Sequence, residues 1–564
     1  EVLFDEGTHI NVEGGTIVIA GTMADPVRFL PNSTTPYKGF YEWIHVNNSP
    51  PYQAVVNAQW AEFSYGVKGF YLDGVQGAQF NHVRFNNTAE AGIYLSQCSG
   101  ISVRNCTFTG SDGWGLKAEF SNNLTFTDNV FSGCTASSVA LWDCEYSSAT
   151  SSTVRAGASE MGVQIIRTSH LLVDGIVIED AITGLELESS VLNTIYDCAF
   201  SKNGVGLMLN ASSDNLFRGN NFNGCAIPLS FIGGLELASN SFELSNLIDG
   251  LPVRAINGGN LDGVSAGAVV MLNCPGSVVS NITFPSTGGA VVVLFGGGNT
   301  LRDFSLGGSA GGIVVLGSSG ILIENVNVTG PAKSGITLWG TQGIGIRDCR
   351  VSGCEAGITF LGPMNITVFR TTLKNTVFDL ALSEQAVVRA LDCSFAAVSV
   401  DAGSRLDEDY TLTVEVRDNQ SLPAQGVDLV VENGGKPLYT TSRFGGIAQL
   451  SDAGGSFSPL VATGTVHAGA SVSPKNTTIE VWDGVRAYDW NPRTLVLTAP
   501  TTAVFSATDM GFLAGMVRDL AGDPVEGVSI LLDGGANMTT FSDGTYTFPP
   551  LSPGTYSLNA SLAG

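Results

Sequence analysis

Charged residues are scarce in this chain of 564 residues, since only 14% are Asp, Glu, Lys or Arg. Basic residues are scarcer than acidic ones, 26 against 51, so the formal net charge is −25. This shortage argues against binding to nucleic acid or to an anionic membrane surface, because both need a basic footprint. No apolar run is long enough to span a bilayer, and neither an initiator Met nor a charged-then-apolar leader begins the chain. We therefore expect a mature, exported protein whose signal peptide has been removed.

Histidine is also rare. The five residues are scattered and show no spacing typical of metal ligands: His9, His45, His82, His170 and His467. The sequence therefore predicts no metal site and no cofactor.

Asn-x-Ser/Thr motifs, in contrast, are dense. Thirteen run through every region of the chain: Asn32, Asn47, Asn86, Asn105, Asn123, Asn210, Asn281, Asn327, Asn365, Asn419, Asn476, Asn537 and Asn559. Chance explains some of them in a chain rich in Asn and Thr, but their number favours an exported glycoprotein with N-linked glycans.

Glycine is frequent, with 70 residues, and many glycines open a phrase that returns every 22 to 24 residues. Copies begin on both sides of a gap, at Gly92, Gly115, Gly162, Gly184, Gly206, Gly312, Gly335 and Gly357. A fixed period of this size is typical of a solenoid, in which each repeat packs only against its neighbours. The second and fourth residues of each copy are apolar, as in Ile93 and Leu95, so we expect positions 2 and 4 to point inward and positions 3 and 5 outward.

A second run in each copy ends at position 17, which is often Phe: Phe85, Phe108, Phe131, Phe200, Phe222, Phe284 and Phe395. In adjacent coils these rings would stack about 4.8 Å apart, the spacing of neighbouring strands. Asn129 and Asn220 stand at position 15, where other copies have Cys. We expect their amides to bond from coil to coil in an internal ladder.

The coils resemble the parallel β-helix repeat family, and residues 13–29 resemble the first turns of many right-handed members. Residues 245–253 and 265–274 resemble the insertion of NosD-like β-helix proteins from archaeal surfaces. The resemblance implies a right-handed parallel β-helix over 1–402 with an insertion at about 232–267. It also carries an association with copper, which the scattered histidines do not support. Because this rod hosts lyases, hydrolases, adhesins and structural proteins, the activity stays open.

Ten cysteines in an exported chain suggest disulfides, but the repeat register argues otherwise. A bridge needs Cα atoms within about 7 Å, whereas positions two coils apart are separated by about 10 Å. Four cysteines share the inward position 15 without lying in adjacent coils, and we expect buried free thiols there: Cys106, Cys198, Cys349 and Cys393. Two local bridges around turns are left as alternatives, Cys134 with Cys144 and Cys349 with Cys354.

Outward positions 3 and 5 of the early coils carry polar side chains and one Trp: Lys117, Glu119, Trp142, Gln164, Glu186 and Glu188. A Trp beside carboxylates suits a sugar ring and its hydroxyls, so these residues form a candidate sugar groove. Glu119 lies three coils from Glu186, roughly 14 Å, whereas glycosidases place acid and base about 5 to 10 Å apart. Glu186 and Glu188 are close enough, but no Arg or Lys stands beside them, and the signatures of pectin-cleaving β-helices are absent from the sequence. No catalytic residue is assigned, and a solvated polar face is the alternative.

The same outward positions become apolar in later coils: Val270, Leu272, Val292, Leu294, Val314, Leu316, Trp339 and Leu361. An apolar stripe of this length would not stay in water. The insertion, the C-terminal modules or a neighbouring molecule would have to cover it. We favour a partner or a folded-back module, and we predict an assembly interface.

The repeat ends near Ser399, and residues 410–418 alternate as a half-buried strand. Trp482, Tyr488 and Trp490 are the expected core of an immunoglobulin-like sandwich over 403–507. Four segments further on resemble the carboxypeptidase regulatory-like family, a small β-sandwich without catalytic residues, over 508–564: residues 515–519, 522–528, 542–546 and 551–556. The match stops where the last strand should finish, so we expect the natural chain to continue.

We thus predict an all-β protein in which a right-handed parallel β-helix is followed by two β-sandwich domains. The predicted function is that of an extracellular structural glycoprotein of an archaeal cell surface, which self-assembles into an S-layer, sheath or filament as a homo-oligomer or polymer. One alternative is a polysaccharide-binding or -cleaving protein that uses the groove around Trp142. Another is an adhesin with a protein or glycan partner.

Overall fold

A computed structural model describes residues 1–48, 53–157, 160–285, 289–308, 312–330, 333–375, 377–484, 486–509, 513–533, 535–548, 551 and 555–562. The chain divides into two compact units, Glu1–Val387 with Ser394–Ser404, and Val388–Cys393 with Arg405–Gly564. Within the described residues all regular structure is β-strand apart from two short 3-10 helices, so the all-β prediction is confirmed. No helix formed by these residues has the length and apolar character to cross a membrane.

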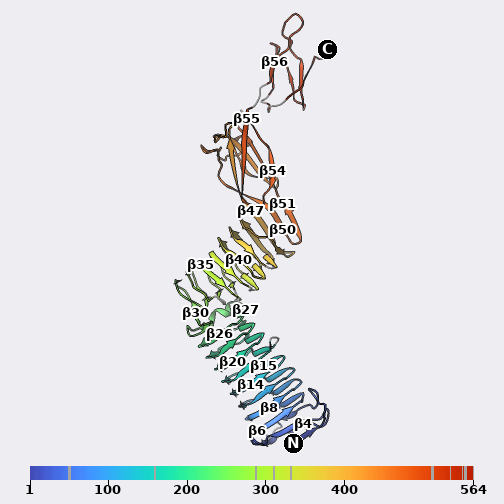
Figure 1. The fold of residues 1–564 in the computed structure, drawn as a ribbon, viewed down its shortest axis with the longest axis vertical. Coiled ribbons are helices and arrows are strands. Elements are labelled where there is room, and N and C mark those ends of the chain that lie inside the picture. The colour runs from blue at the N-terminus through green and yellow to red at the C-terminus, as the bar shows by residue number, and fades with distance from the viewer. Residues whose placement is uncertain are drawn as a thin grey trace. The chain divides into compact units, whose positions relative to one another are not determined.

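From β9 (Ala91–Ser96) to β24 (Val205–Asn210), each coil of the first unit has one longer strand followed by two short ones. In one coil, β12 (Trp114–Glu119) precedes β13 (Thr125–Thr127) and β14 (Val130–Ser132). Each strand pairs in parallel with its counterpart one coil away, so the coils stack in sequence order (Figure 1). The longer strands form a 10-stranded sheet: β2 (Ile10–Glu13), β5 (Ile44–Asn47), β7 (Lys68–Asp73), β9 (Ala91–Ser96), β12, β15 (Ser137–Trp142), β18 (Met161–Ile166), β21 (Thr183–Glu188), β24 (Val205–Asn210) and β27 (Ile227–Ile232).

The short strands form two further parallel ladders that both start from β8 (Gln79–Asn86). One contains β10 (Ser102–Arg104), β13, β16 (Ser148–Thr150), β19 (Leu172–Asp174), β22 (Thr194–Tyr196), β25 (Leu216–Arg218) and β28 (Ser241–Phe242). The other contains β11 (Thr107–Thr109), β14, β17 (Thr153–Arg155), β20 (Val177–Glu179), β23 (Ala199–Ser201), β26 (Asn221–Asn223) and β29 (Leu247–Ile248). The opening residues belong to the same stack, as predicted, because β3 (Gly15–Ala20) and β4 (Val27–Pro31) pair in parallel with β6 (Ala54–Ser64), and β1 (Val2–Phe4) with β4.

The repeated glycine has a steric cause. A Cβ at Gly92 would lie 2.5 Å from the ring of Phe108, and one at Gly115 would lie 2.6 Å from the ring of Phe131. The Phe at position 17 therefore occupies the space that a side chain at position 1 of the same coil would need. Positions 2 and 4 point inward as predicted, and Ile93 and its equivalents are fully buried.

The predicted Phe ladder is present in the early coils. Ring centroids lie 5.0 Å apart between Phe85 and Phe108, 4.6 Å between Phe108 and Phe131, and 4.7 Å between Phe200 and Phe222. All three pairs are stacked, because parallel strands set successive rings at the strand spacing. Phe284 and Phe395 are only half-buried and lie outside these stacks.

Amide side chains form the predicted internal ladders. Asn129 Nδ2 donates to the backbone oxygen of Val103, and Asn220 Nδ2 donates to that of Ile195. A second ladder, at another turn, runs through Asn193 and Asn215. Because these amides are buried, each bond satisfies a polar group that water does not reach.

All ten cysteines are buried and none forms a disulfide, so neither local bridge is formed and the prediction of buried, unbridged thiols at position 15 is confirmed. Burial raises the pKa of the thiols of Cys106 and Cys198 to about 12. Because only the thiolate reacts, we expect no cysteine to be alkylated by iodoacetamide at pH 8 in the native protein. Mass spectrometry should find ten labelled sites only after denaturation. Rapid labelling of Cys106 in the native state would contradict this burial.

The predicted insertion is a joint between two stacks of coils. After the 3-10 helix η1 (Leu235–Ser239), β28 and β29 end the ladders of the first stack. The chain then reverses, because β29 pairs antiparallel with β30 (Leu251–Ile256). From β30 a new parallel sheet runs through the second stack: β32 (Ala268–Leu272), β34 (Ala290–Leu294), β36 (Gly312–Leu316), β38 (Ser334–Trp339), β41 (Ala356–Leu361), β44 (Phe378–Ser383) and β46 (Val398–Val400).

The other strands of the second stack lie on its remaining sides. They are β31 (Leu261–Asp262), β33 (Val278–Ser280), β35 (Thr300–Gly307), β37 (Leu322–Thr329), β39 (Gly345–Arg347), β40 (Arg350–Ser352), β42 (Met364–Phe369), β43 (Thr372–Lys374) and β45 (Ala386–Leu391).

The apolar stripe of the second stack points outward as predicted, but most of it is not a free surface. Five members are buried: Val270, Leu272, Val292, Leu294 and Leu316. They share one hydrophobic cluster with Leu229 of β27 and Leu237 of η1. Our preference for a partner or a folded-back module as the cover was therefore wrong, because the end of the first stack and the insertion cover these residues. Only Val314, Leu361 and Trp339 are half-buried or exposed, and assembly through them stays a prediction.

The second unit contains a β-sandwich. One sheet is built on β47 (Arg405–Arg417), which pairs with β50 (Leu460–Ala468) and β55 (Thr501–Asp509), with β51 (Ser471–Pro474) and β53 (Arg486–Tyr488) beyond them. The other is β49 (Lys436–Thr440), β48 (Asp428–Asn433), β52 (Asn476–Trp482) and β54 (Arg493–Val496); a second 3-10 helix, η2 (Ser442–Phe444), follows β49. Tyr488 is buried in the core as predicted, whereas Trp482 is half-buried beneath Arg443. Trp490 is 85% exposed, so its assignment to the core was wrong.

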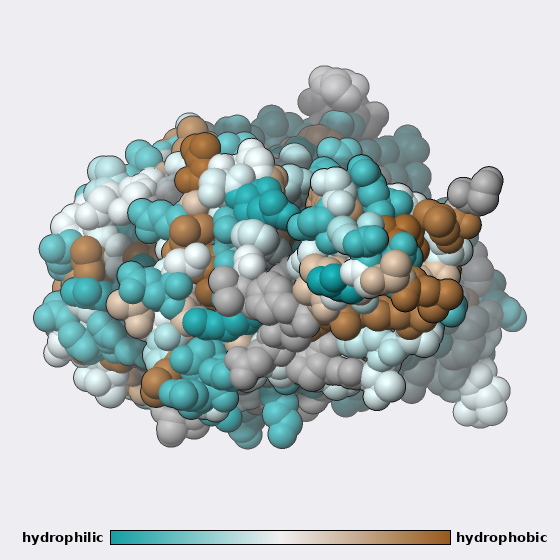
Figure 2. Space-filling view, turned by 90° about the horizontal axis from the view of Figure 1, so that it is seen from above, coloured by the Kyte–Doolittle hydropathy of each residue, from teal (hydrophilic) through white to brown (hydrophobic). Residues whose placement is uncertain are grey.

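The last module is a smaller pair of sheets. Strands β58 (Asn537–Thr539) and β60 (Leu558–Ser561) flank β57 (Ser529–Leu532), and β56 (Ala514–Met516) pairs with β59 (Thr545–Thr547). Ile530, Leu532 and Phe548 form its core. Part of the 551–556 motif, Ser552 to Gly554, lies outside the described residues. Seen from above, hydrophilic residues and small groups of hydrophobic ones are mixed over the surface (Figure 2).

Candidate functional site on the outer face of the first stack

The predicted groove residues lie on the outer face of the 10-stranded sheet. Lys117 and Glu119 stand on β12, and Trp142 ends β15. Gln164 stands on β18, while Glu186 and Glu188 stand on β21. Strand register carries these positions along successive coils, because Lys117 pairs with Ala140, Ala140 with Gln164, and Gln164 with Glu186.

Hydrogen bonds join three of these side chains across coils. Trp142 Nε1 donates to Gln164 Oε1 at 3.3 Å. Gln164 Nε2 donates to Glu186 Oε2 at 3.1 Å. The gap between Glu119 and Glu186 is thus filled by Trp142 and Gln164, which gives a continuous polar and aromatic surface.

Lys117 lies in a cage of aromatic rings. Its Nζ is 4.1 Å from the ring centre of Trp114 and 4.0 Å from that of Trp142, and it pairs with Glu119 Oε1 at 2.8 Å. The side chain is only 10% exposed. Cation–π contacts of this kind are stronger when the ammonium is shielded from water, so the cage holds both rings in place.

Lys68 has a similar cage two coils earlier. Its Nζ is 4.9 Å from the ring centre of Trp43, 5.5 Å from that of Tyr71 and 5.4 Å from that of Tyr94. It pairs with Glu90 Oε2 at 2.6 Å, and its side chain is 9% exposed. Neither cage was predicted as a unit, and Lys68, Trp43, Tyr71, Tyr94 and Trp114 were missed.

Five aromatic side chains therefore form one band, which we call the aromatic band: Trp43, Tyr71, Tyr94, Trp114 and Trp142. Each comes from a different coil, and the coils are successive. Tyr71 and Tyr94 stack with ring centres 5.1 Å apart, and Trp114 meets Trp142 edge to face at 6.0 Å. Four strand spacings make the band roughly 20 Å long. Tyr71 and Tyr94 stand at position 3 of the two coils before that of Lys117, so extending the numbering to those coils would have identified them.

The ionisable groups at the band are held in fixed states. Burial, together with the carboxylate of Glu119, raises the pKa of Tyr94, so its hydroxyl stays protonated and donates to Glu119 Oε2 at 2.5 Å. Burial lowers the pKa of His45, whose ring stacks on Tyr71 at 4.6 Å, so this imidazole is neutral at neutral pH. Both oxygens of Glu119 are engaged, one by Lys117 and one by Tyr94.

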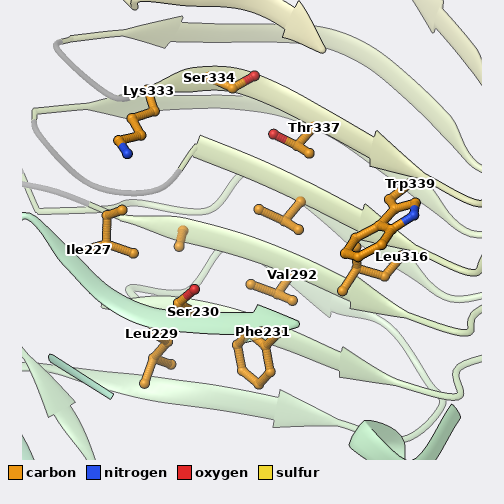
Figure 3. A pocket seen from close by; sticks show the side chains of 12 residues that line it. Ile227, Leu229, Ser230, Phe231, Val292, Leu316, Lys333, Ser334, Thr337 and Trp339 are labelled. Carbon is orange, nitrogen blue, oxygen red and sulfur yellow. The ribbon is translucent and has the colours of Figure 1, made fainter. Parts of the chain in front are cut away.

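A cavity of about 200 Å³ lies where the two stacks of the first unit meet. Its walls are mostly apolar and come from β27, β34, β36 and β38, with Lys333 and Trp339 at opposite sides of the opening (Figure 3). Four stripe residues line it: Val292, Val314, Leu316 and Trp339. No group of three or more His, Cys, Asp and Glu side chains in the described part of the chain could hold a metal ion.

Solved structures similar to this chain include the Streptococcal ancillary pilin, with 15% identity, 28% of this chain covered and a TM-score of 0.17. The catalytic domain of an α-1,3-glucanase in complex with nigerose has 11% identity, 66% coverage of this chain and a TM-score of 0.22. A tailspike protein of an E. coli bacteriophage in complex with a pentasaccharide has 11% identity, 97% coverage, 86% of its own length matched and a TM-score of 0.25. This chain spans only 54% of the pilin and 61% of the glucanase domain. No curated protein matches it.

Two protein families match the chain. Residues 513–564 match the carboxypeptidase regulatory-like domain, which confirms that module. Residues 68–222, 151–250 and 267–430 match the right-handed β-helix region, together more than half of the chain. These residues contain most of the stacked coils described above, and the chain belongs to the right-handed β-helix family.

Proposed function

We propose that the aromatic band binds a glycan chain laid along the stack of coils. The observation that carries this proposal is one half-exposed ring from each of five successive coils, with hydrogen-bonding side chains between them. A sugar presents apolar C–H faces and polar hydroxyl edges, so it needs rings to stack on and side chains to bond its hydroxyls. A long, regular row of such groups fits a polymer better than a single small molecule.

The charges of the site favour a neutral or amino-sugar glycan. Lys68 and Lys117 are covered by rings and paired with Glu90 and Glu119, so they offer little free positive charge. Glu186 on the same face adds negative charge, and the whole chain carries −25. A polyuronate would therefore be repelled, whereas an uncharged or amine-bearing sugar would not.

Binding fits the site better than cleavage. Glu119 has no free oxygen, and Glu186 accepts a bond from Gln164. Glu186 and Glu188 stand two residues apart on one strand, about 7 Å, which is within the range that glycosidases use. Loss of oligosaccharide turnover in Glu186→Gln or Glu188→Gln protein would establish cleavage as a second activity.

The structural role predicted from the sequence is a weaker proposal, because the apolar stripe that supported it is mostly buried within the chain. An extracellular, cell-surface location and an archaeal source are proposals of the same kind. None of the thirteen sequon asparagines falls in the buried class, which is compatible with N-linked glycans on an exported protein.

We expect Trp142→Ala to weaken glycan binding roughly tenfold, because the ring stacks on the sugar and also covers Lys117. Calorimetric titration with a neutral β-glucan, a chitosan oligosaccharide and a polyuronate should show binding of one of the first two and not of the third. Trp490→Ala is the matched control, since Trp490 is 85% exposed on the sandwich and should leave affinity unchanged. Equal affinity of wild type and Trp142→Ala protein, or tightest binding of the polyuronate, would refute the proposal.

A further inference from the structure

The turns that follow the 10-stranded sheet place residues in the left-handed backbone region in every early coil. Two columns of such residues run along the stack. The second column contains Gly77, Gly100, Asn123, Tyr146, His170, Leu192 and Asp214, all with positive φ. Parallel bridges between the residues just before them, such as Glu145 with Ser169, keep the column in register.

Most members of this column are residue types that suit positive φ. Gly has no Cβ to clash, and Asn, Asp and His adopt this conformation more readily than other residues. Tyr146 has φ 48° and Leu192 has φ 57°, which is a strained conformation for large side chains. The first column lies three residues earlier in each coil. Phe120 belongs to it, has φ 50° and is strained in the same way.

These side chains do not gain stability by burial. Phe120 is 62% exposed, Tyr146 59% and Leu192 51%. The rings of Tyr146 and His170 stack with centres 4.7 Å apart on the surface. Backbone strain and exposed apolar area both reduce stability, so core packing does not explain these four residues, which we call the corner patch.

The corner patch borders the aromatic band. Phe120 directly follows Glu119 of β12, and Tyr146 lies four residues after Trp142 at the end of β15. Both columns therefore run along the 10-stranded sheet at the ends of its strands, and the patch shares the coils of β12 and β15 with the band. His170 and Leu192 extend it to the next two coils, after β18 and β21. The patch has one side chain per coil, so its area is far smaller than the roughly 800 Å² per partner of a stable protein interface.

We propose that the corner patch is a second wall of the glycan site, on which the same neutral or amino-sugar chain stacks. This inference rests on the proposed function of the aromatic band. Tyr146 and His170 present both a ring face and a polar tip, as a sugar requires. The strain at Tyr146 and Leu192 is retained for binding, in the way that functional sites elsewhere retain strained residues.

The test measures the melting temperature and the glycan affinity of the full chain, and the inference predicts that the first rises while the second falls. Tyr146→Gly places at this corner the residue found at Gly77 and Gly100, so we expect the melting temperature to rise by about 1 to 2 °C. The same change should weaken binding of the glycan preferred by the wild type at least fivefold, since it removes a stacking surface. Leu192→Gly should likewise raise the melting temperature and weaken binding of the glycan.

Asp214→Gly is the control, because Asp214 belongs to the same column but not to the patch, and it should leave affinity unchanged. A fall in melting temperature in Tyr146→Gly protein would show that the ring has a structural role and would overturn the inference. So would unchanged affinity in Tyr146→Gly protein when Trp142→Ala protein binds more weakly. If Trp142→Ala protein also binds as well as the wild type, the proposed function itself fails.

Discussion

Replacement of Asn215 by alanine is expected to lower the local free energy of unfolding by about 3 to 4 kcal/mol. The buried amide accepts bonds from the backbone nitrogen and the side chain of Asn193, and it donates to the backbone oxygen of Ser190 and to Asn240 Oδ1. Alanine leaves the buried backbone N–H of Asn193 without an acceptor, which costs the desolvation of that group. It also removes one of the two bonds made by each of Asn193 Nδ2, the backbone oxygen of Ser190 and Asn240 Oδ1.

The loss should be confined to nearby coils, because each coil of a solenoid packs only against its neighbours. Native-state hydrogen exchange should show protection of the Asn193 amide reduced roughly a hundredfold or more, with amides near Phe85 unchanged. Asn223→Ala is the matched control, since Asn223 is exposed at the end of β26 and should change stability by only a few tenths of a kcal/mol. A loss in Asn215→Ala protein below about 1 kcal/mol would contradict the bonded ladder.

The second large effect concerns the joint between the stacks. We expect Val292→Asp to destabilise the first unit by on the order of 4 kcal/mol or more, because the outward-pointing Val292 is 1% exposed and belongs to the cluster that contains Leu229 of β27. A carboxylate there would be buried among apolar side chains. Urea unfolding of the whole chain, followed by Trp fluorescence, would measure the change.

Ala381→Asp is the control for this experiment. Ala381 stands in the same register column, reached through Val314, Thr337 and Thr359, and it is half-exposed. The expected change is within about 0.5 kcal/mol. If Val292→Asp protein were as stable as the wild type but failed to associate into oligomers, the stripe would be an interface between molecules rather than a joint within one.

Much of the first stack was predictable, because its physics is periodic. Alternation within a strand separates inward Ile93 from outward Tyr94, and the spacing of Gly and Phe shows where each coil begins. The buried cysteines without disulfides and the amide ladders followed from the same register. Each of these features depends on neighbours at a constant separation along the chain, which a single sequence displays.

The candidate site was predictable in part. Numbering each coil from its glycine located Lys117 and Trp142 on the outer face. It overlooked Lys68 and Trp114, which lie just before the opening glycines and so outside the numbered positions. It also overlooked Trp43, whose coil has no opening glycine, because Trp43 stands where the next coil has Gly69. Whether the aromatic rings turn toward Lys68 and Lys117 depends on side-chain rotamers and on ion pairs across coils. Periodicity contains no information about either.

The sequence by itself determined the all-β coil, the direction of its side chains and the residues that stack inside it, because these depend on local alternation and a fixed repeat. Only the tertiary structure decided what covers the outer faces. The same outward positions carry rings of the open aromatic band on β9 and β15 and form a buried joint on β32 and β34. The reason is the chain reversal between β29 and β30, which brings the end of the first stack over Val292. Such a contact joins segments without a common period, so only the folded chain brings it about.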